Sequence, residues 1–139
     1  MLFRSRLLAH TADMGIEATG ASRAEVFVAA ARGLKEMIFG DIPVTPRQGA
    51  PVALDSGDVG ELLVAWLGEI LYLSEVRGLV PGEFVIHEIT ETSLRGEVRG
   101  EPFDPKRHPV EREVKAITYH QLYVQQESQG WRARVYVDL

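Results

Sequence analysis

The sequence predicts an α+β protein, with a mixed, mainly antiparallel sheet structure and two principal helices packed on it. Apolar residues recur at helical spacing after Ser22 and again after Asp58, and four alternating stretches follow the second helix. Strands that follow well-separated helices favour antiparallel pairing, with both helices on one sheet face. A length of 139 residues, 45% of them hydrophobic, suits a single domain over residues 1–139.

Composition excludes several classes of site. The chain has no cysteine, which excludes disulfides, zinc–thiolate sites, iron–sulfur clusters and cysteine nucleophiles. Fifteen basic and twenty acidic residues give a net charge of −5, which opposes unaided binding to a phosphate backbone and suits a basic partner. No apolar run reaches the ~18 residues of a membrane span, so we expect a cytoplasmic protein with no membrane association.

The N-terminal segment predicts two strands around a polar corner. Residues 2–9 alternate in hydrophobicity, and residues 16–19 form a second, shorter strand. Between them lies the stretch His10-Thr11-Ala12-Asp13-Met14-Gly15. Threonine and aspartate bond their own backbone at turns and glycine permits a positive φ, so this stretch predicts a tight turn.

A first helix follows. Ser22 and Glu25 form a Ser-x-x-Glu capping box, and Gly40 ends the apolar pattern. Three prolines in residues 41–51 predict an exposed connection, with a short strand at residues 52–54.

The second helix is predicted to be well buried. Asp58 is its expected N-cap, with Glu61 three residues later. Because Trp66 lies among leucines at helical spacing, we expect it in the core and not as a stacking platform for a base. Glycine and proline at Gly78 and Pro81 end the element.

Extended segments occupy the rest of the chain, at residues 83–90, 93–100, 113–125 and 130–139. Glu91-Thr92 separates the first two and predicts a two-residue hairpin turn.

The last segment ends at an aspartate, Asp138, followed by Leu139. If it reaches Asp13, two side-chain carboxylates and the α-carboxylate of Leu139 would share one site. Oxygen ligands favour Ca²⁺, Mg²⁺ or Mn²⁺ over zinc. Carboxylates about 4 Å apart repel by ~4 kcal/mol at an effective dielectric constant of about 20, so such a site requires a cation or a proton. Sequence spacing alone does not bring these residues together.

Six stretches in order carry a family resemblance: residues 10–15, 22–25, 62–67, 99–108 and 114–120, and the terminal Val137-Asp138-Leu139. Together they resemble the archease family, which implies an archease-like fold. The resemblance also implies an accessory protein of the tRNA-splicing RNA ligase, which promotes GTP-dependent guanylylation and multiple turnover of the ligase. The ligase catalytic subunit, which carries the guanylylated histidine, would be a transient partner, and RNA would be reached only through the ligase.

The resemblance also implies a metal site, because the matching positions of the family hold a divalent ion. Here these positions are Asp13, Asp138 and the terminal carboxylate of Leu139. Relatives often end in isoleucine at the last position, a difference that leaves the carboxylate unchanged.

Three further residues are candidates for contacting the ligase or a nucleotide: His10, Lys115 and His120. His10 either ligates the metal, acts as a base or is a hydrogen-bonded structural group. Lys115, Thr118 and His120 are predicted on one strand, where Thr118 and His120 share a face.

The loop at residues 103–109 contains Lys106, Arg107 and His108, the only compact basic spot that the sequence predicts. It is either a solvated loop or a contact to RNA phosphate.

Known catalytic motifs are absent from the sequence: it has no P-loop, dinucleotide fingerprint, nucleophile elbow or zinc-protease motif. We therefore expect no catalysis by the chain alone. Two alternatives stay open, a metal-dependent hydrolase with His10 or His120 as base, and a general chaperone-like binding protein.

Overall fold

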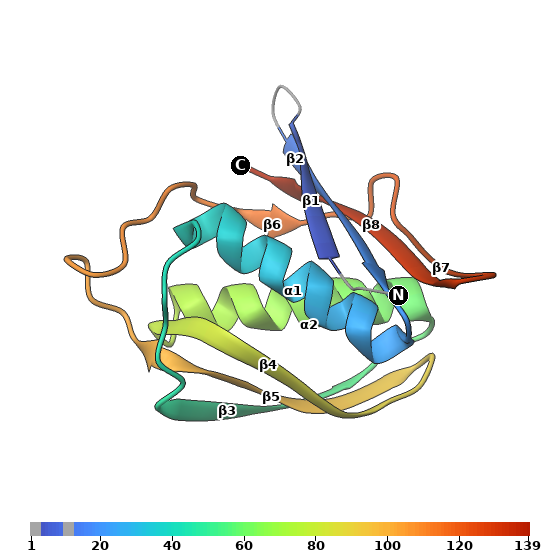
Figure 1. Cartoon of the computed structure of the whole chain (residues 1–139), viewed down its shortest axis with the longest axis horizontal. Helices are drawn as coiled ribbons and strands as arrows, with labels where there is room; N and C mark the ends of the chain where they lie inside the picture. The colour runs from blue at the N-terminus through green and yellow to red at the C-terminus, as the bar shows by residue number, and fades with distance from the viewer. Residues whose placement is uncertain (1–3, 10–12) are drawn as a thin grey trace.

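Two antiparallel sheets enclose two helices in the computed structural model, which describes residues 4–9 and 13–139 (Figure 1). The larger sheet has the order β1-β2-β8-β6, with β7 also paired to β8, and the smaller sheet has the order β3-β5-β4. In chain order, the elements are β1 (Arg4–Ala9), β2 (Asp13–Gly20), α1 (Arg23–Phe39), β3 (Gln48–Asp55), α2 (Val59–Glu75), β4 (Leu79–Ile89), β5 (Ser93–Pro102), β6 (Ala116–Ile117), β7 (Tyr123–Glu127) and β8 (Gly130–Asp138).

The predicted fold class is confirmed, since two helices pack on antiparallel sheets. Every strand pair that the structure describes is antiparallel. The helices lie between two sheets, however, and not on one face of a single sheet: α1 contacts β1, β2 and β4, and α2 contacts β3, β4, β6 and β7 (Figure 1). Among the described residues, no helix has both the length and the apolar character needed to cross a membrane.

Both helices begin at their predicted capping residues, and α1 also ends at its predicted glycine, whereas α2 ends at Glu75, before Gly78. The Ser22 hydroxyl accepts a hydrogen bond from the Glu25 amide at 3.2 Å, and the Asp58 carboxylate accepts one from the Glu61 amide at 2.9 Å. Gly40 ends α1 with a φ of 74°, a conformation that favours glycine.

The core between the sheets is centred on α2. Trp66 is fully buried, as predicted, and its indole N–H donates to the Phe27 carbonyl at 3.0 Å. Its ring meets Phe84 of the smaller sheet edge-on, at 6.2 Å between centroids. On the other side, α1 packs closely on β2, because a Cβ at Gly33 would lie only 2.8 Å from Cγ2 of Ile16. The same helix pair therefore covers both sheets.

The predicted turn at residues 10–15 is wrong in its second half. Residues 10–12 lie outside the described residues, but Asp13, Met14 and Gly15 already belong to β2. Gly15 does not have a positive φ. Pairing with β1 and β8 extends the strand, and this tertiary pairing overrides the local turn preference.

A single strand over residues 113–125 is also wrong. Only β6 and β7 are extended there, and a turn with Gln121 at a φ of 50° separates them. The Thr118 hydroxyl accepts a hydrogen bond from the His120 amide at 3.3 Å, which helps to turn the chain. Thr118 and His120 therefore do not share a strand face.

β3, β4 and β5 run longer than predicted, whereas β8 ends at Asp138, one residue before the predicted end. β3 covers residues 48–55 rather than 52–54, and it tolerates Pro51 because it is an edge strand. The Glu91-Thr92 hairpin is confirmed by the bond from the Thr90 amide to the Ser93 carbonyl, at 2.9 Å.

Candidate metal centre

The first residue of β2 and the last residue of β8 lie directly opposite each other. In this antiparallel pair, the register joins Asp13 to Asp138. Opposite residues of such a pair share one face of the sheet, with Cβ atoms about 4.5–5.5 Å apart. The fold thus brings together two aspartates from opposite ends of the sequence.

β6 fixes the end of β8 from the other side. Ala116 is the register partner of Asp138, and the Lys115 amide donates to the Asp138 carbonyl at 2.8 Å. Two residues earlier, the amide and the hydroxyl of Thr118 both donate to the Tyr136 carbonyl at 2.9 Å. The backbone of Asp138 is therefore held in place while its side chain is exposed to solvent.

The chemistry of the donor set fits a hard divalent cation. Asp13 is half-buried, and its Oδ1 is inaccessible to solvent. Like charges directly opposite each other in a sheet are destabilising, so a cation between the two carboxylates would relieve their repulsion. Within the described ranges, no group of three His, Cys, Asp or Glu side chains could hold a metal. The described side chains that could hold the predicted ion are those of Asp13 and Asp138, and the predicted third donor is the carboxylate of Leu139.

Two of the residues predicted to contact the ligase or a nucleotide lie beside Asp138 and Tyr136 at the end of β8. Lys115 is exposed, and its backbone N–H donates the hydrogen bond to the Asp138 carbonyl described above. The His120 ring packs edge-on against Tyr136 at 5.6 Å between centroids. His10 lies outside the described residues.

Lys106 and Arg107 lie elsewhere, in the loop between β5 and β6 that extends at the left of Figure 1, away from the end marked C. The predicted basic spot is wrong for His108, which is only 1% exposed. Its Nδ1 accepts from the Asp104 amide at 2.9 Å, so its Nε2 carries the proton and donates to Glu101 at 2.8 Å. Arg107 pairs with the same carboxylate at 3.1 Å.

Glu101 therefore holds this loop on β5, an arrangement that the sequence analysis missed. Nothing in the spacing of Glu101 and His108 distinguishes this pair from exposed neighbours. The hydrogen bond from His108 lowers the pKa of the Glu101 carboxyl, and Arg107 and Arg47 lower it further against the effect of burial. The ionised carboxylate of Glu101 therefore accepts the hydrogen bond from His108 and pairs with Arg107 in the folded protein.

In Glu101→Gln, the free energy of unfolding should fall less as the pH is lowered than it does in the unmodified protein. Because the folded-state pKa is below the unfolded value of about 4.3, the carboxylate stabilises the fold above about pH 4.3, and this contribution is lost as pH falls through the lowered pKa. Urea unfolding over a series of acid pH values measures this contribution to the free energy of unfolding. Glu97→Gln, at a partly exposed site on the same strand, is the control. If the free energy of unfolding of Glu101→Gln falls with acid pH as steeply as that of the unmodified protein, the stabilising role given to the Glu101 carboxylate would be wrong.

Comparisons with known proteins agree with this fold. Residues 6–139 match the model of the Archease protein family. Protein archease of Methanosarcina acetivorans is 40% identical over 136 residues, which cover 95% of this chain and 93% of the relative. Protein archease of Methanopyrus kandleri is 37% identical, with 94% and 95% covered.

Two solved structures share the architecture. The solution structure of protein 1598 from Methanobacterium thermoautotrophicum has a TM-score of 0.81 and 30% identity, and covers 97% of this chain and 98% of its own. An archease and possible chaperone from Thermotoga maritima has a TM-score of 0.60 at 18% identity, covering 96% of each chain, and this likeness concerns the fold alone. Because the family model matches residues 6–139 and a relative is 40% identical over 95% of the chain, the chain belongs to the archease family.

Proposed function

We propose that this protein activates the tRNA-splicing RNA ligase by promoting its GTP-dependent guanylylation and multiple turnover, using an acidic divalent-metal site. The observation that carries the proposal is the register of β2 on β8, which sets Asp13 opposite Asp138. Membership of the archease family supports the same role. In this proposal the protein is an accessory factor of the ligase and not an enzyme itself.

Asp13, Asp138 and the carboxylate of Leu139 would hold the ion, which is Ca²⁺, Mg²⁺ or Mn²⁺. When bound, such an ion supplies positive charge that can orient and neutralise phosphate oxygens. The acidic chain would be drawn to a basic cleft of the ligase catalytic subunit, which mainly speeds the encounter. Exposed Lys115 and the His120 ring, beside the same corner, are proposed to contact the ligase or its nucleotide.

The proposed setting is the cytoplasm, where the ligase would be a transient partner and the RNA substrate would be presented by the ligase. Lys106 and Arg107 are proposed as a secondary contact to RNA held there. The loop that carries them extends away from the C-terminal end of β8 in Figure 1, so this contact would lie outside the proposed metal site.

The test is guanylylation and multiple turnover of the ligase with and without this protein. Substoichiometric amounts should stimulate both, and Asp138→Asn should remove most of the stimulation because one of the two side-chain donors is lost. Asp55→Asn, an exposed aspartate at the end of β3, makes the same charge change and should have no effect.

Other outcomes would select the alternatives. GTP hydrolysis or RNA joining by the chain alone, abolished by Asp138→Asn, would indicate a metal-dependent hydrolase. Stimulation that is equal in Asp138→Asn and survives a chelator would instead indicate a chaperone-like effect on the ligase.

A further inference from the structure

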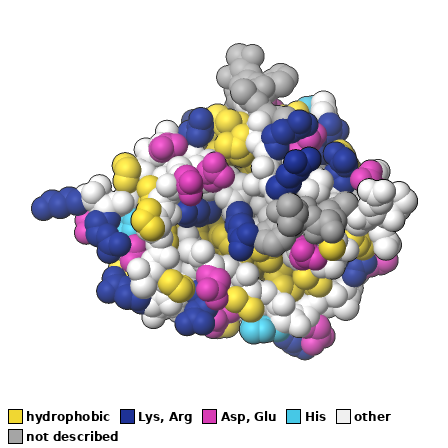
Figure 2. All heavy atoms as spheres, viewed as in Figure 1, with side chains coloured by type: hydrophobic (Ala, Val, Ile, Leu, Met, Phe, Trp, Pro, Cys, Tyr) yellow, Lys and Arg dark blue, Asp and Glu magenta, His cyan; other side chains and the backbone are white. Residues whose placement is uncertain are grey.

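The outer face of the larger sheet carries arginines at alternate positions on its strands. In β8, Ala133, Val135 and Val137 are buried, so Arg132 and Arg134 point away from the helices. On β1, Arg4 and Arg6 are likewise exposed. Figure 2 shows Lys and Arg side chains gathered over β1, β2 and β8.

The strand register aligns these arginines in two rows across three strands. One row is Arg4 of β1, Thr19 of β2 and Arg132 of β8. In the next row, Arg6 and Arg134 flank Glu17. Because neighbouring strands are about 4.8 Å apart, the two arginines of the first row rise on either side of Thr19, with no acidic residue between them.

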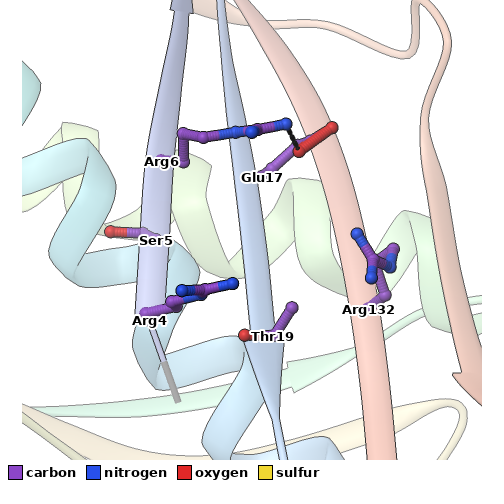
Figure 3. A pocket seen from close by; sticks show the side chains of 6 residues that line it. All are labelled: Arg4, Ser5, Arg6, Glu17, Thr19 and Arg132. Atoms are coloured by element: carbon purple, nitrogen blue, oxygen red, sulfur yellow. Dashed lines mark hydrogen bonds and ion pairs between the residues drawn. The ribbon is translucent and has the colours of Figure 1, made fainter. Parts of the chain in front are cut away.

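A hollow of about 350 Å³ lies over this position. Figure 3 shows Arg4 and Arg6 from β1 and Arg132 from β8 around it, with Thr19 and Glu17 on β2 between them. Ser5 also lines the hollow, but its Cβ and hydroxyl lie near Gly33 of α1, on the opposite face of the sheet. Among the described residues, the side chains facing the hollow are therefore three guanidinium groups, one carboxylate and one hydroxyl.

The ion pairs around the hollow leave an excess of positive charge. Arg6 pairs with Glu17, and Arg132 pairs with Glu127 at 3.2 Å. Exposed pairs of this kind are weak, and each guanidinium has five N–H donors, so donors remain for a second acceptor. No ion pair of Arg4 is present among the described residues.

We propose that this hollow binds a phosphate group of an RNA backbone, with Arg4 and Arg132 on either side and the Thr19 hydroxyl donating from below. Guanidinium pairs suit phosphate oxygens because their planar donors match the anion. The sheet face is open and twisted, and Arg6 and Arg134 lie in the next row. Such a surface suits a single-stranded RNA that continues past the hollow. This inference goes beyond the proposed function and differs from its expectation that RNA is reached only through the ligase, because the contact belongs to this chain and requires neither the ligase nor the metal.

The hollow and the candidate metal centre lie on the same face of the larger sheet. Arg132 and Asp138 are on the same face of β8, six residues and therefore roughly 20 Å apart. One end of this face is acidic and the other is basic. A bound RNA strand would be held at the basic end, where the acidic corner does not repel it.

The test measures binding of a labelled single-stranded RNA by fluorescence anisotropy, with a chelator present, no ligase, and several salt concentrations. Arg4→Gln/Arg132→Gln should weaken binding at least about tenfold at low salt and reduce the slope of log affinity against log salt by about 0.7, because the contact to one phosphate is lost. Thr19→Val keeps a β-branched strand residue and should cost about threefold to tenfold. Different RNA sequences should bind equally well.

Controls separate this site from net charge and from the metal site. Arg95→Gln/Arg99→Gln removes the same charge from exposed positions of β5, in the other sheet, and should bind RNA as the unmodified protein does. Asp138→Asn should also retain RNA binding, so a failed ligase assay leaves this result intact. Circular dichroism should confirm that each variant is folded.

Four outcomes would overturn the proposal. They are no RNA binding by the unmodified protein at low salt, an equal loss in the β5 control, binding of inorganic phosphate as strong as that of RNA at equal phosphate concentration, and loss of ligase affinity without loss of RNA affinity in Arg4→Gln/Arg132→Gln. The third would assign the hollow to a free oxyanion, and the fourth would assign it to a protein partner.

Discussion

Replacing Asp138 with asparagine should lower the affinity for divalent cations by more than about 100-fold. Loss of a group that only supports a metal ligand typically costs 10–100-fold, and Asp138 is proposed as a direct ligand. Asparagine retains the shape of the side chain and one carbonyl oxygen but not the charge. Titration calorimetry with Ca²⁺, Mg²⁺ and Mn²⁺ measures the loss, and Asp13→Asn should give a similar result from the opposite strand.

When no metal is present, Asp138→Asn should stabilise the protein, although it lowers the affinity for cations. Asp13 and Asp138 are like charges in directly opposite positions, so removing one charge should stabilise the metal-free protein by about 0.2–1 kcal/mol. Thermal unfolding with a chelator and with added cation separates the two effects. Asp55→Asn should change neither quantity. Unchanged cation affinity in both Asp13→Asn and Asp138→Asn would disprove the site.

Replacing Trp66 with alanine should destabilise the protein by about 3–5 kcal/mol. The side chain is fully buried between α1 and the smaller sheet, where it contacts Phe84 and donates to the Phe27 carbonyl. The substitution leaves a large cavity, and the Phe27 carbonyl, which lies inside α1, loses the donor that it has in addition to its helical one. Urea unfolding, followed by circular dichroism, measures the loss.

Trp66→Phe separates the two contributions. Phenylalanine fills most of the volume but cannot donate, so its cost should fall to about 0.5–1.5 kcal/mol, the net contribution of a typical hydrogen bond, because the Phe27 carbonyl keeps its helical donor. Tyr119→Ala, at a side chain that is 62% exposed, should stay within about 0.5 kcal/mol. A cost for Trp66→Ala as small as that of Tyr119→Ala would contradict the burial of the indole.

The helices could be predicted from the sequence because their signals are local. Ser22 and Asp58 are three residues from the amides they cap, and the apolar spacing of each helix is complete within its own length. The division of the strands between two sheets has no local signal. An apolar face of a strand indicates that something covers it, but it does not indicate which sheet the strand joins, because α1 and α2 each contact strands of both sheets.

The candidate metal centre was predicted only through the family resemblance. Asp13 and Asp138 become neighbours through the register of β2 on β8, which depends on the packing of the entire larger sheet. The arginine rows illustrate the same limit. Arg4, Arg6, Arg132 and Arg134 alternate visibly in the sequence, yet only strand pairing shows that Thr19 lies between two of them.

The central position of β8 in the larger sheet has a consequence for folding kinetics. β8 pairs with β2, β6 and β7, although β2 is separated from it by almost the whole sequence. Contacts of such high sequence separation form slowly, because loop closure precedes any gain from pairing. During synthesis, α1, α2 and the smaller sheet can assemble from residues 23–102 while the β1–β2 hairpin still lacks its neighbour. Until β8 emerges, the free edge of β2 can pair with another nascent chain, so delayed synthesis of the last strand should increase aggregation.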